Sequence, residues 1–134
     1  MIFVDTVSWL YLFDKGQNNL EAKKAKRFIE SLKEPLCTSD LIIAETYKWL
    51  LHHGRPQAQS IAVLDSLLCQ QMAIILSVEP NDRTIAFALI KKYKDQNLSY
   101  EDAITVAQAT RLGIKKIFSF DRHFLLFPNL KRVP

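Results

Sequence analysis

The chain has 134 residues, of which 49% are hydrophobic, and it contains only 3 glycines and 5 prolines. This length and composition predict one compact domain over residues 1–134 and exclude a disordered or fibrous protein. The 18 Lys and Arg residues outnumber the 14 Asp and Glu residues, and the net charge of +4 mildly favours a polyanionic partner. The sequence shows no apolar run of membrane-spanning length and no signal peptide, so we expect a cytoplasmic protein without a membrane partner.

The N-terminal stretch is a short apolar run, residues 1–4, that ends at Asp5 and Thr6. Such a run predicts a central strand of a parallel sheet, buried on both faces. An acidic residue at the carboxyl end of that strand stands where ligands of open α/β sheets bind. Asp5 also has a structural interpretation, because Asp is a common N-cap and a helix over residues 7–13 is expected to follow. This stretch alone leaves both interpretations open.

Helical patterns and short strands alternate along the rest of the chain. Helices are predicted over residues 19–34, 40–53, 57–71, 80–94 and 100–112, and strands over 36–38, 73–78, 116–119 and 131–133. Gly16 is expected to close the first helix, and Ile61 and Leu68 are expected to face the core. Residues 122–127 are expected to form a turn or a short helix. The alternation predicts an α/β fold, with a parallel sheet, right-handed crossovers and helices on both faces.

Four acidic residues are predicted at one edge of this sheet. Asp5 and Asp121 follow strands, whereas Glu45 and Asp102 lie in the N-terminal halves of helices, which gather at the same edge. When it is taken alone, each of these acids can be interpreted as a structural residue, either a helix cap or an exposed helical residue. If they converge, two carboxylates about 5 Å apart repel by roughly 3 kcal/mol at an effective dielectric constant of 20, so the cluster needs a counter-charge.

The chemistry of the cluster predicts the type of counter-charge. Mg²⁺ and Mn²⁺ are hard cations that suit carboxylate and water ligands and leave positions for phosphate oxygens. The three histidines have no metal-ligand spacing with one another, which argues against a zinc site. An RNA partner would also need a basic rim, and the nearest candidates in sequence to Asp121 are Lys115, Lys116, Arg122 and His123.

These features together resemble the PIN domain, and most closely the small VapC-type ribonuclease toxins. The resemblance rests on Val4-Asp5-Thr6, on Ser39 with Glu45, on residues 98–103 followed by Ala107, and on Ser119-Phe120-Asp121 with Arg122 and Phe124. It implies a three-layer PIN-like fold, with a parallel sheet of about five strands in the order 3-2-1-4-5. It also implies metal-dependent hydrolysis of phosphodiester bonds in single-stranded RNA, and a single-stranded or structured RNA as the partner.

The resemblance also assigns roles to single residues and to partners. Asp5, Asp102 and Asp121 would hold Mg²⁺ or Mn²⁺, and Glu45 would complete the acidic site. Thr6 and Ser119 would orient these carboxylates or the waters around them. A small cognate antitoxin and a homodimer are the partners that VapC-type toxins imply.

Other functions on an α/β sheet fit the sequence less well. The chain does not resemble a receiver domain or a haloacid-dehalogenase phosphatase, because it lacks their acidic pair or Asp-x-Asp after the first strand. It has no glycine-rich phosphate-binding loop. One alternative stays open, a non-catalytic RNA-binding or protein-interaction module on the same fold, because a fold alone does not determine a function.

Overall fold

Five parallel strands form the centre of the molecule. The structure is a computed structural model that describes residues 1–16 and 18–134. The strands are β1 (Ile2–Val4), β2 (Leu36–Ser39), β3 (Ile74–Leu76), β4 (Lys116–Phe118) and β5 (Lys131–Val133). Their order is β3-β2-β1-β4-β5, and every neighbouring pair is parallel. The order expected from the resemblance is therefore confirmed.

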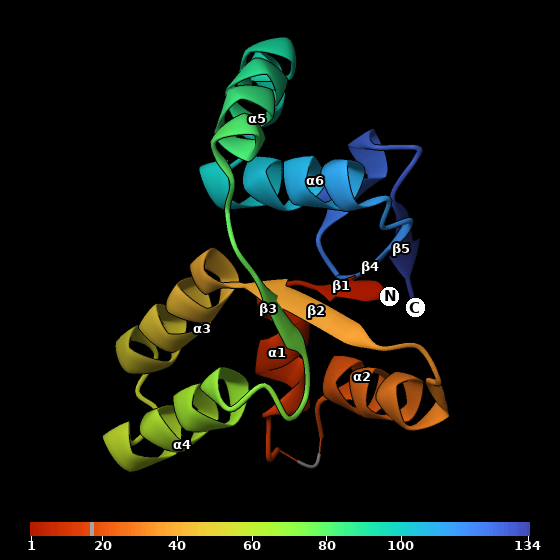
Figure 1. The fold of residues 1–134 in the computed structure, drawn as a ribbon. Helices are drawn as coiled ribbons and strands as arrows, with labels where there is room; N and C mark the ends of the chain where they lie inside the picture. The colour runs from red at the N-terminus through yellow and green to blue at the C-terminus, as the bar shows by residue number, and fades with distance from the viewer. Residues whose placement is uncertain (17) are drawn as a thin grey trace.

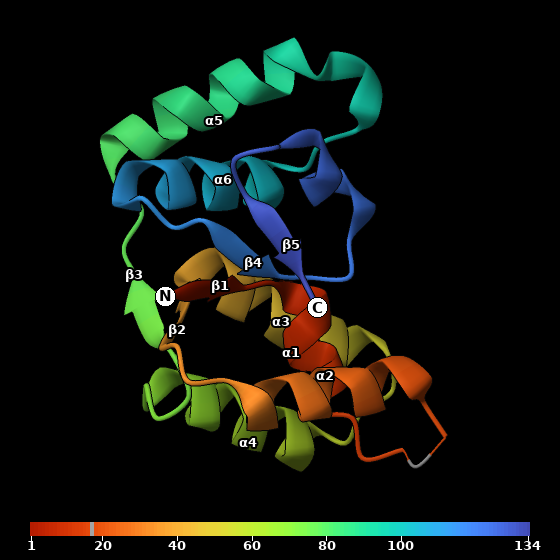
Figure 2. The ribbon, with the colours of Figure 1, turned by 90° about the vertical axis from the view of Figure 1, so that its right-hand side faces the viewer.

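Helices cover both faces of this sheet. They are α1 (Thr6–Leu12), α2 (Leu20–Ser31), α3 (Asp40–His52), α4 (Gln57–Leu68), α5 (Pro80–Lys92) and α6 (Tyr100–Leu112), with two short 3₁₀ helices, η1 (Lys94–Gln96) and η2 (Arg122–Leu126). Helices α1 to α4 lie on one face of the sheet, and α5 and α6 lie on the other (Figure 1). The side view shows the same three layers (Figure 2).

The order of the strands explains this division of the helices. The chain moves outward from β1 through β2 to β3 and then returns to β4 on the other side of β1. Because right-handed crossovers in opposite directions put their helices on opposite faces, the return segment carries α5 and α6 across the second face. The strand order reverses between β1 and β4, and ligands of such sheets bind outside the carboxyl ends of the strands at this point.

The core is centred on β1. Its residues Ile2, Phe3 and Val4 are at most 2% exposed, as is expected for a strand covered on both faces. Trp9 of α1 is fully buried, and its Nε1 donates a hydrogen bond of 3.2 Å to Thr38 Oγ1 in β2. This contact ties α1 to the sheet and therefore fixes the turn between β1 and α1, where Asp5 lies.

Two local predictions were wrong, the end of the first helix and the inward face of α4. Helix α1 ends at Leu12 and is capped by Phe13, so Gly16 lies beyond the helix and does not close it. Ile61 and Leu68 are 51% and 50% exposed, because α4 buries only a narrow face that includes Leu67.

None of the helices in residues 1–16 and 18–134 combines the length and the apolar character of a membrane span.

Candidate functional site

Asp5 occupies the turn between β1 and α1, and both interpretations of this residue apply. Its Oδ1 accepts a hydrogen bond of 2.7 Å from the backbone N–H of Thr6, which makes it the N-cap of α1. Its Oδ2 accepts a hydrogen bond of 2.7 Å from the hydroxyl of Ser119, which follows β4. The carboxylate is only 3% exposed, so it caps the helix and also lies within the cluster of acids at the sheet edge.

Ser119 connects the first and the last of the predicted acidic residues. Its hydroxyl donates to Asp5 and accepts a hydrogen bond of 3.0 Å from the backbone N–H of Asp121. The guanidinium of Arg132 in β5 donates to the backbone carbonyls of Phe120 and Asp121 at 3.2 and 3.3 Å. The loop that carries Asp121 is therefore held both from β1 and from β5.

Asp102 enters the site from the other face of the sheet, in the first turn of α6. Its backbone N–H donates to the hydroxyl of Ser99, the N-cap of this helix, at 3.1 Å. The residue is 8% exposed, and Oδ2 of its carboxylate lies 3.7 Å from His123 Nδ1. The same nitrogen lies 3.2 Å from Asp121 Oδ1. Asp102, Asp121 and His123 thus each offer a ligand atom within 4.8 Å of the others.

Glu45 reaches the site from the second turn of α3. The hydroxyl of Thr6 donates a short hydrogen bond to Glu45 Oε2, so the residue after Asp5 holds the fourth acid. Glu45 is half-buried, and Glu101 of α6 lies beside it along the same groove. The structure thus brings together Asp5, Glu45, Asp102 and Asp121, and hydrogen bonds join Thr6 and Ser119 to three of them, Asp5, Glu45 and Asp121.

The electrostatics of the cluster show a deficit of positive charge. The pKa of Asp5 is raised to about 7, first by burial and then by the charges of Asp102 and Glu45, although the hydrogen bonds from Ser119 and Thr6 oppose this shift. Burial and then the charge of Asp121 raise the pKa of Asp102 to about 6.

Glu45 follows the same trend. Its pKa is raised first by burial and then by Glu101 and Asp121, with the Thr6 hydroxyl opposing the shift. A cation among these carboxylates would stabilise their ionised forms.

The donor set fits a divalent cation with oxygen ligands. Carboxylate oxygens of Asp102 and Asp121 lie within 4.8 Å of each other, and Asp5 is close enough to Asp102 for the two charges to interact. Carboxylate oxygens are the ligands that Mg²⁺ and Mn²⁺ prefer. In addition, His123 Nδ1 is buried and has no hydrogen-bond partner among the described residues, although it faces two carboxylates. Asp5, Asp102 and Asp121 are the residues that would hold the cation.

The predicted basic rim is only partly at the site. Lys115 and Lys116 lie at the amino end of β4, opposite the edge that carries Asp121, and Lys116 pairs with Glu34. A strand rises about 3.3 Å per residue, so nearness in sequence to Asp121 is not nearness in space. These two lysines therefore lie outside the basic rim of the site. Arg122 is exposed next to Asp121, whereas His123 turns inward toward the acids.

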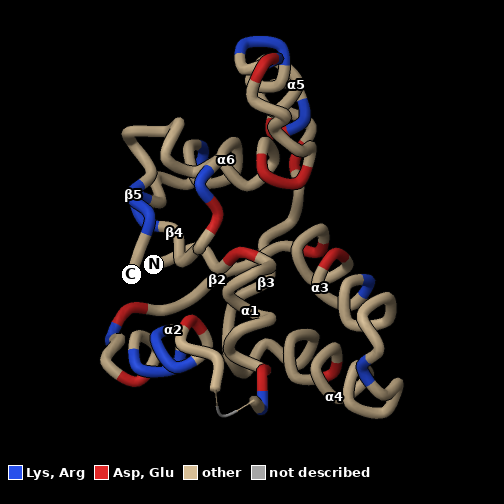
Figure 3. The backbone as a smooth tube through the Cα atoms, turned by 180° about the vertical axis from the view of Figure 1, so that it is seen from behind, with Lys and Arg blue, Asp and Glu red and all other residues tan. Residues whose placement is uncertain are grey.

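Sequence reasoning missed several charged residues around the site. Lys24 of α2 lies over the ring of Phe120, with Nζ 6.0 Å from the ring centre, which brings a basic residue beside the Asp121 loop. Figure 3 shows that Lys and Arg residues gather along α2. Lys48 of α3 lies near Glu45 and lowers its pKa against the larger effect of burial. Only tertiary contacts reveal these positions, although the spacing of Glu45 and Lys48 on one helix face was a usable signal.

The acids that follow β3 lie elsewhere. Asp82 is fully buried and forms an ion pair with Arg111, with Arg111 Nε 2.8 Å from Asp82 Oδ1. Arg111 is in the last turn of α6, whereas Asp102 is in its first turn. Glu79 caps α5 and takes part in a capping box with Asp82. These two acids therefore hold α5 in place, outside the acidic cluster.

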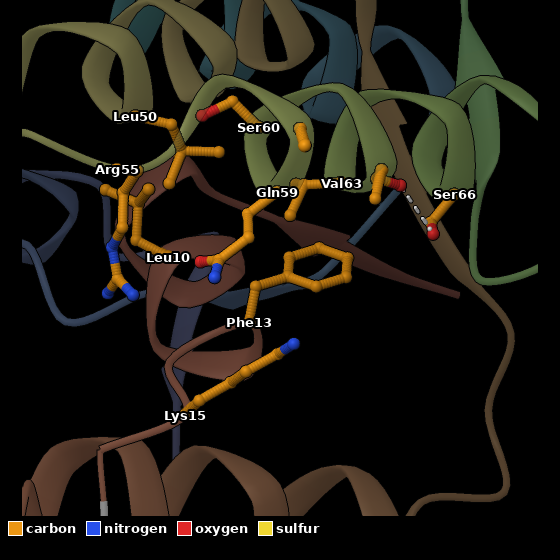
Figure 4. A pocket seen from close by; sticks show the side chains of 11 residues that line it. Leu10, Phe13, Lys15, Leu50, Arg55, Gln59, Ser60, Val63 and Ser66 are labelled. Carbon is orange, nitrogen blue, oxygen red and sulfur yellow. Dashed lines mark hydrogen bonds between the residues drawn. The ribbon is translucent and has the colours of Figure 1, made fainter.

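Two grooves border α3 and α4. The first, which we call the α3 groove, has a volume of about 390 Å³ and is lined by Leu41, Ala44, Glu45, Lys48, Trp49, His52, His53 and Glu101. It therefore begins at the acidic cluster and runs along α3. The second, of about 330 Å³, lies between α1 and α4, and Leu10, Phe13 and Val63 point into it (Figure 4). The four acids are not among the described residues that line it.

Comparisons with known proteins agree with this fold. The model of the PIN domain family matches residues 2–130. Among solved structures, VapC20 of Mycobacterium tuberculosis, a sarcin-ricin loop cleaving toxin, gives a TM-score of 0.83 at 23% identity, over 94% of both chains. A toxin-antitoxin complex from Klebsiella pneumoniae gives 0.71 at 18% identity, over 97% of this chain and 95% of its own.

A third structure shares the fold. VapBC2 of Rickettsia felis, bound to a DNA fragment from its promoter, gives a TM-score of 0.74 at 16% identity, over 99% of this chain and 98% of its own. No curated protein sequence matches the chain. The family match spans nearly the whole chain, from β1 to the residue before β5. The chain therefore belongs to the PIN-domain family.

Proposed function

We propose that this protein is a metal-dependent endoribonuclease that hydrolyses phosphodiester bonds of RNA, and that it is the toxin of a toxin–antitoxin pair. The single observation that carries the proposal is the convergence of Asp5, Asp102 and Asp121 at the reversal of strand order, where burial raises the pKa values of the first two. The toxins among its structural neighbours support the biological role. One domain over residues 1–134 carries the activity.

The roles of the residues follow from their contacts. A bound Mg²⁺ or Mn²⁺ supplies an activated water and neutralises charge that develops on the phosphate. Asp5, Asp102 and Asp121 hold the cation. The hydroxyl of Ser119 fixes the position of the Asp121 loop relative to the Asp5 carboxylate. Glu45 is held by the Thr6 hydroxyl, and burial raises its pKa, so we assign it the role of the group that accepts a proton from the attacking water.

The α3 groove is the path that we propose for a single RNA strand. Trp49 is 37% exposed and stacks on His53 with ring centres 3.9 Å apart and an angle of 4° between the planes. Such a stacked pair offers a face on which a base packs without sequence readout. Lys48, Arg122 and Lys24 supply positive charge around the acids, so RNA binding should weaken as salt rises.

An antitoxin and a second copy of the chain are the proposed partners. An antitoxin segment in the α3 groove would cover Glu45 and exclude RNA from the same surface. The toxin-antitoxin complexes among the structural neighbours support an antitoxin as the partner. A homodimer of the 15.5 kDa chain in the cytoplasm is the proposed free state, and gel filtration at high micromolar concentration checks its size.

The alternative is a module that binds RNA or protein on the same fold without catalysis. A direct test incubates labelled single-stranded and hairpin RNA with the protein, in EDTA and then with Mg²⁺ or Mn²⁺. A ribonuclease cleaves only when metal is present and loses cleavage in the Asp102→Asn variant while RNA binding survives. RNA binding without cleavage in any metal would favour the non-catalytic module.

A further inference from the structure

The side chain of His123 turns inward toward the acidic cluster, whereas a residue of an RNA-binding rim would face outward. It lies in η2, two residues after Asp121, and the buried Phe124 next to it anchors this segment in the core. Its Nε2 lies 2.9 Å from the backbone carbonyl of Gln96 in η1. A carbonyl accepts only a hydrogen, so this contact places a proton on Nε2. In the neutral ring, Nδ1 then carries the lone pair.

That lone pair faces two carboxylates. Nδ1 lies 3.2 Å from Asp121 Oδ1 and 3.7 Å from Asp102 Oδ2, and it is buried without a hydrogen-bond partner among the described residues. A lone pair and two carboxylates repel one another unless a positive charge lies among them. Ligands of an octahedral cation at about 2.1 Å are separated by about 3.0 Å when adjacent and about 4.2 Å when opposite. The separation of 3.2 Å is close to the value for adjacent ligands, and the separation of 3.7 Å falls between the two values.

We propose that His123 is a metal ligand through Nδ1, beside Asp102 and Asp121, and that it gives the site a preference for Mn²⁺ over Mg²⁺. The proposal rests on the metal site of the proposed function and adds a nitrogen donor to it. The hydrogen bond from Nε2 to the Gln96 carbonyl is the orienting contact that metal-bound histidines usually make on their second nitrogen. Mn²⁺ shares the preference of Mg²⁺ for oxygen ligands, but as a first-row transition metal it also binds at sites with nitrogen donors, whereas Mg²⁺ requires near-ideal octahedral geometry and keeps several waters.

An opposite role for the same residue makes a clear contrast. As a protonated imidazolium, His123 would be a counter-charge that neutralises Asp102 and Asp121 and competes with any metal. Its removal would then strengthen the binding of both Mn²⁺ and Mg²⁺. If His123 is a ligand, its removal weakens Mn²⁺ binding by about 10-fold or more and weakens Mg²⁺ binding by less. The preference of the site for Mn²⁺ over Mg²⁺ then falls. The two roles therefore predict changes of opposite sign.

The test uses purified protein without RNA. Mn²⁺ and Mg²⁺ affinities are measured by calorimetry for wild type, His123→Ala and the control His52→Ala, whose exposed histidine lines the α3 groove. Electron spin-echo spectroscopy of bound Mn²⁺ then reports directly whether a nitrogen is coordinated. We expect ¹⁴N modulation in wild type and in His52→Ala, and its loss in His123→Ala.

The spectrum of the wild type keeps the proposal falsifiable even if a variant fails to fold. Bound Mn²⁺ without ¹⁴N modulation, no Mn²⁺ binding, or tighter binding by folded His123→Ala would each overturn it. Neither readout depends on hydrolysis. A nitrogen-bound Mn²⁺ in a protein that cleaves no RNA would leave this inference standing and refute the proposed nuclease.

Discussion

Asp5 and Asp102 should make the metal-free protein less stable as pH rises. Both have a folded pKa above the unfolded value near 4, at about 7 and about 6, so the folded state binds more protons between these limits. An excess of bound protons in the folded state means that the free energy of unfolding falls as pH increases through this window. The full stabilisation is present below about pH 4 and is lost above about pH 7.

The size of this effect is measurable. A shift from 3.8 to about 7 at Asp5 corresponds to up to about 4 kcal/mol. Urea unfolding in EDTA at pH 5, 6, 7 and 8 should show this decline, and saturating Mn²⁺ should flatten it. A stability in EDTA that rises steadily from pH 5 to pH 8 would contradict the pKa assignments.

Ser119 positions the acidic residues without being a metal ligand itself, so its substitution tests how much the alignment of the carboxylates matters. Ser119→Ala removes two buried hydrogen bonds, one to Asp5 and one from the N–H of Asp121, and should cost about 1–2 kcal/mol of stability. Because the carboxylates stay but are less well aligned, cleavage should fall about 10-fold, mainly in kcat. The matched control is Ser66→Ala on α4, whose hydroxyl donates a hydrogen bond to the backbone carbonyl of Ala62. Equal cleavage by Ser119→Ala and wild type would show that this link is dispensable.

At the residue scale, sequence reasoning placed the acids but not their surroundings. Asp5, Asp102 and Asp121 could be located because strand ends and helix starts have local signals, an apolar run that stops and a Ser cap. The inward orientation of His123 and the approach of Lys24 to Phe120 depend on how η2 and α2 pack. No local pattern encodes such contacts between distant segments.

The ion pair between α5 and α6 should affect stability without affecting chemistry. Arg111→Met leaves the buried carboxylate of Asp82 without its partner and should cost about 2–3 kcal/mol. The pair lies at the opposite end of α6 from Asp102, so RNA cleavage per folded molecule should remain within about 2-fold of wild type. Urea unfolding and a cleavage assay on the same sample check both statements.

The double variant Asp82→Asn, Arg111→Met is the control for this pair. Removing the charge from the buried position should recover part of the lost stability. Loss of cleavage in a folded Arg111→Met protein would mean that the two ends of α6 are coupled, which the geometry gives no reason to expect.

Elements with strong local signals were predicted well, and surfaces between elements were not. Ser99 at the start of α6 and Gly113 at its end, with φ of +67°, mark the two boundaries that the sequence indicated. By contrast, periodicity assigned Ile61 and Leu68 to the core, although both are about half exposed. Periodicity shows which residues share a face of a helix, but not how wide a face its neighbours cover.

At the scale of the whole molecule, strand order determines where the chemistry lies. The return of the chain past β1 to β4 brings Asp5 and Asp121 to neighbouring strand ends, and it brings α6 with Asp102 across from the other face. Alternating strands and helices predicted the α/β class, whereas the order came from the resemblance to the PIN family. Pattern alone does not reveal strand order, because every right-handed arrangement of the same elements has the same local sequence signals.

Thermal unfolding of wild type and Asp5→Asn, each in EDTA and in Mn²⁺ at pH 7.5, tests the central claim that these acids form one metal site. In EDTA the variant should melt at a higher temperature, because it relieves a buried charge and Asn still caps α1. Saturating Mn²⁺ should raise the melting temperature of wild type much more than that of the variant. Equal melting temperatures in EDTA together with equal responses to Mn²⁺ would show that Asp5 is only a helix cap, and would contradict the account.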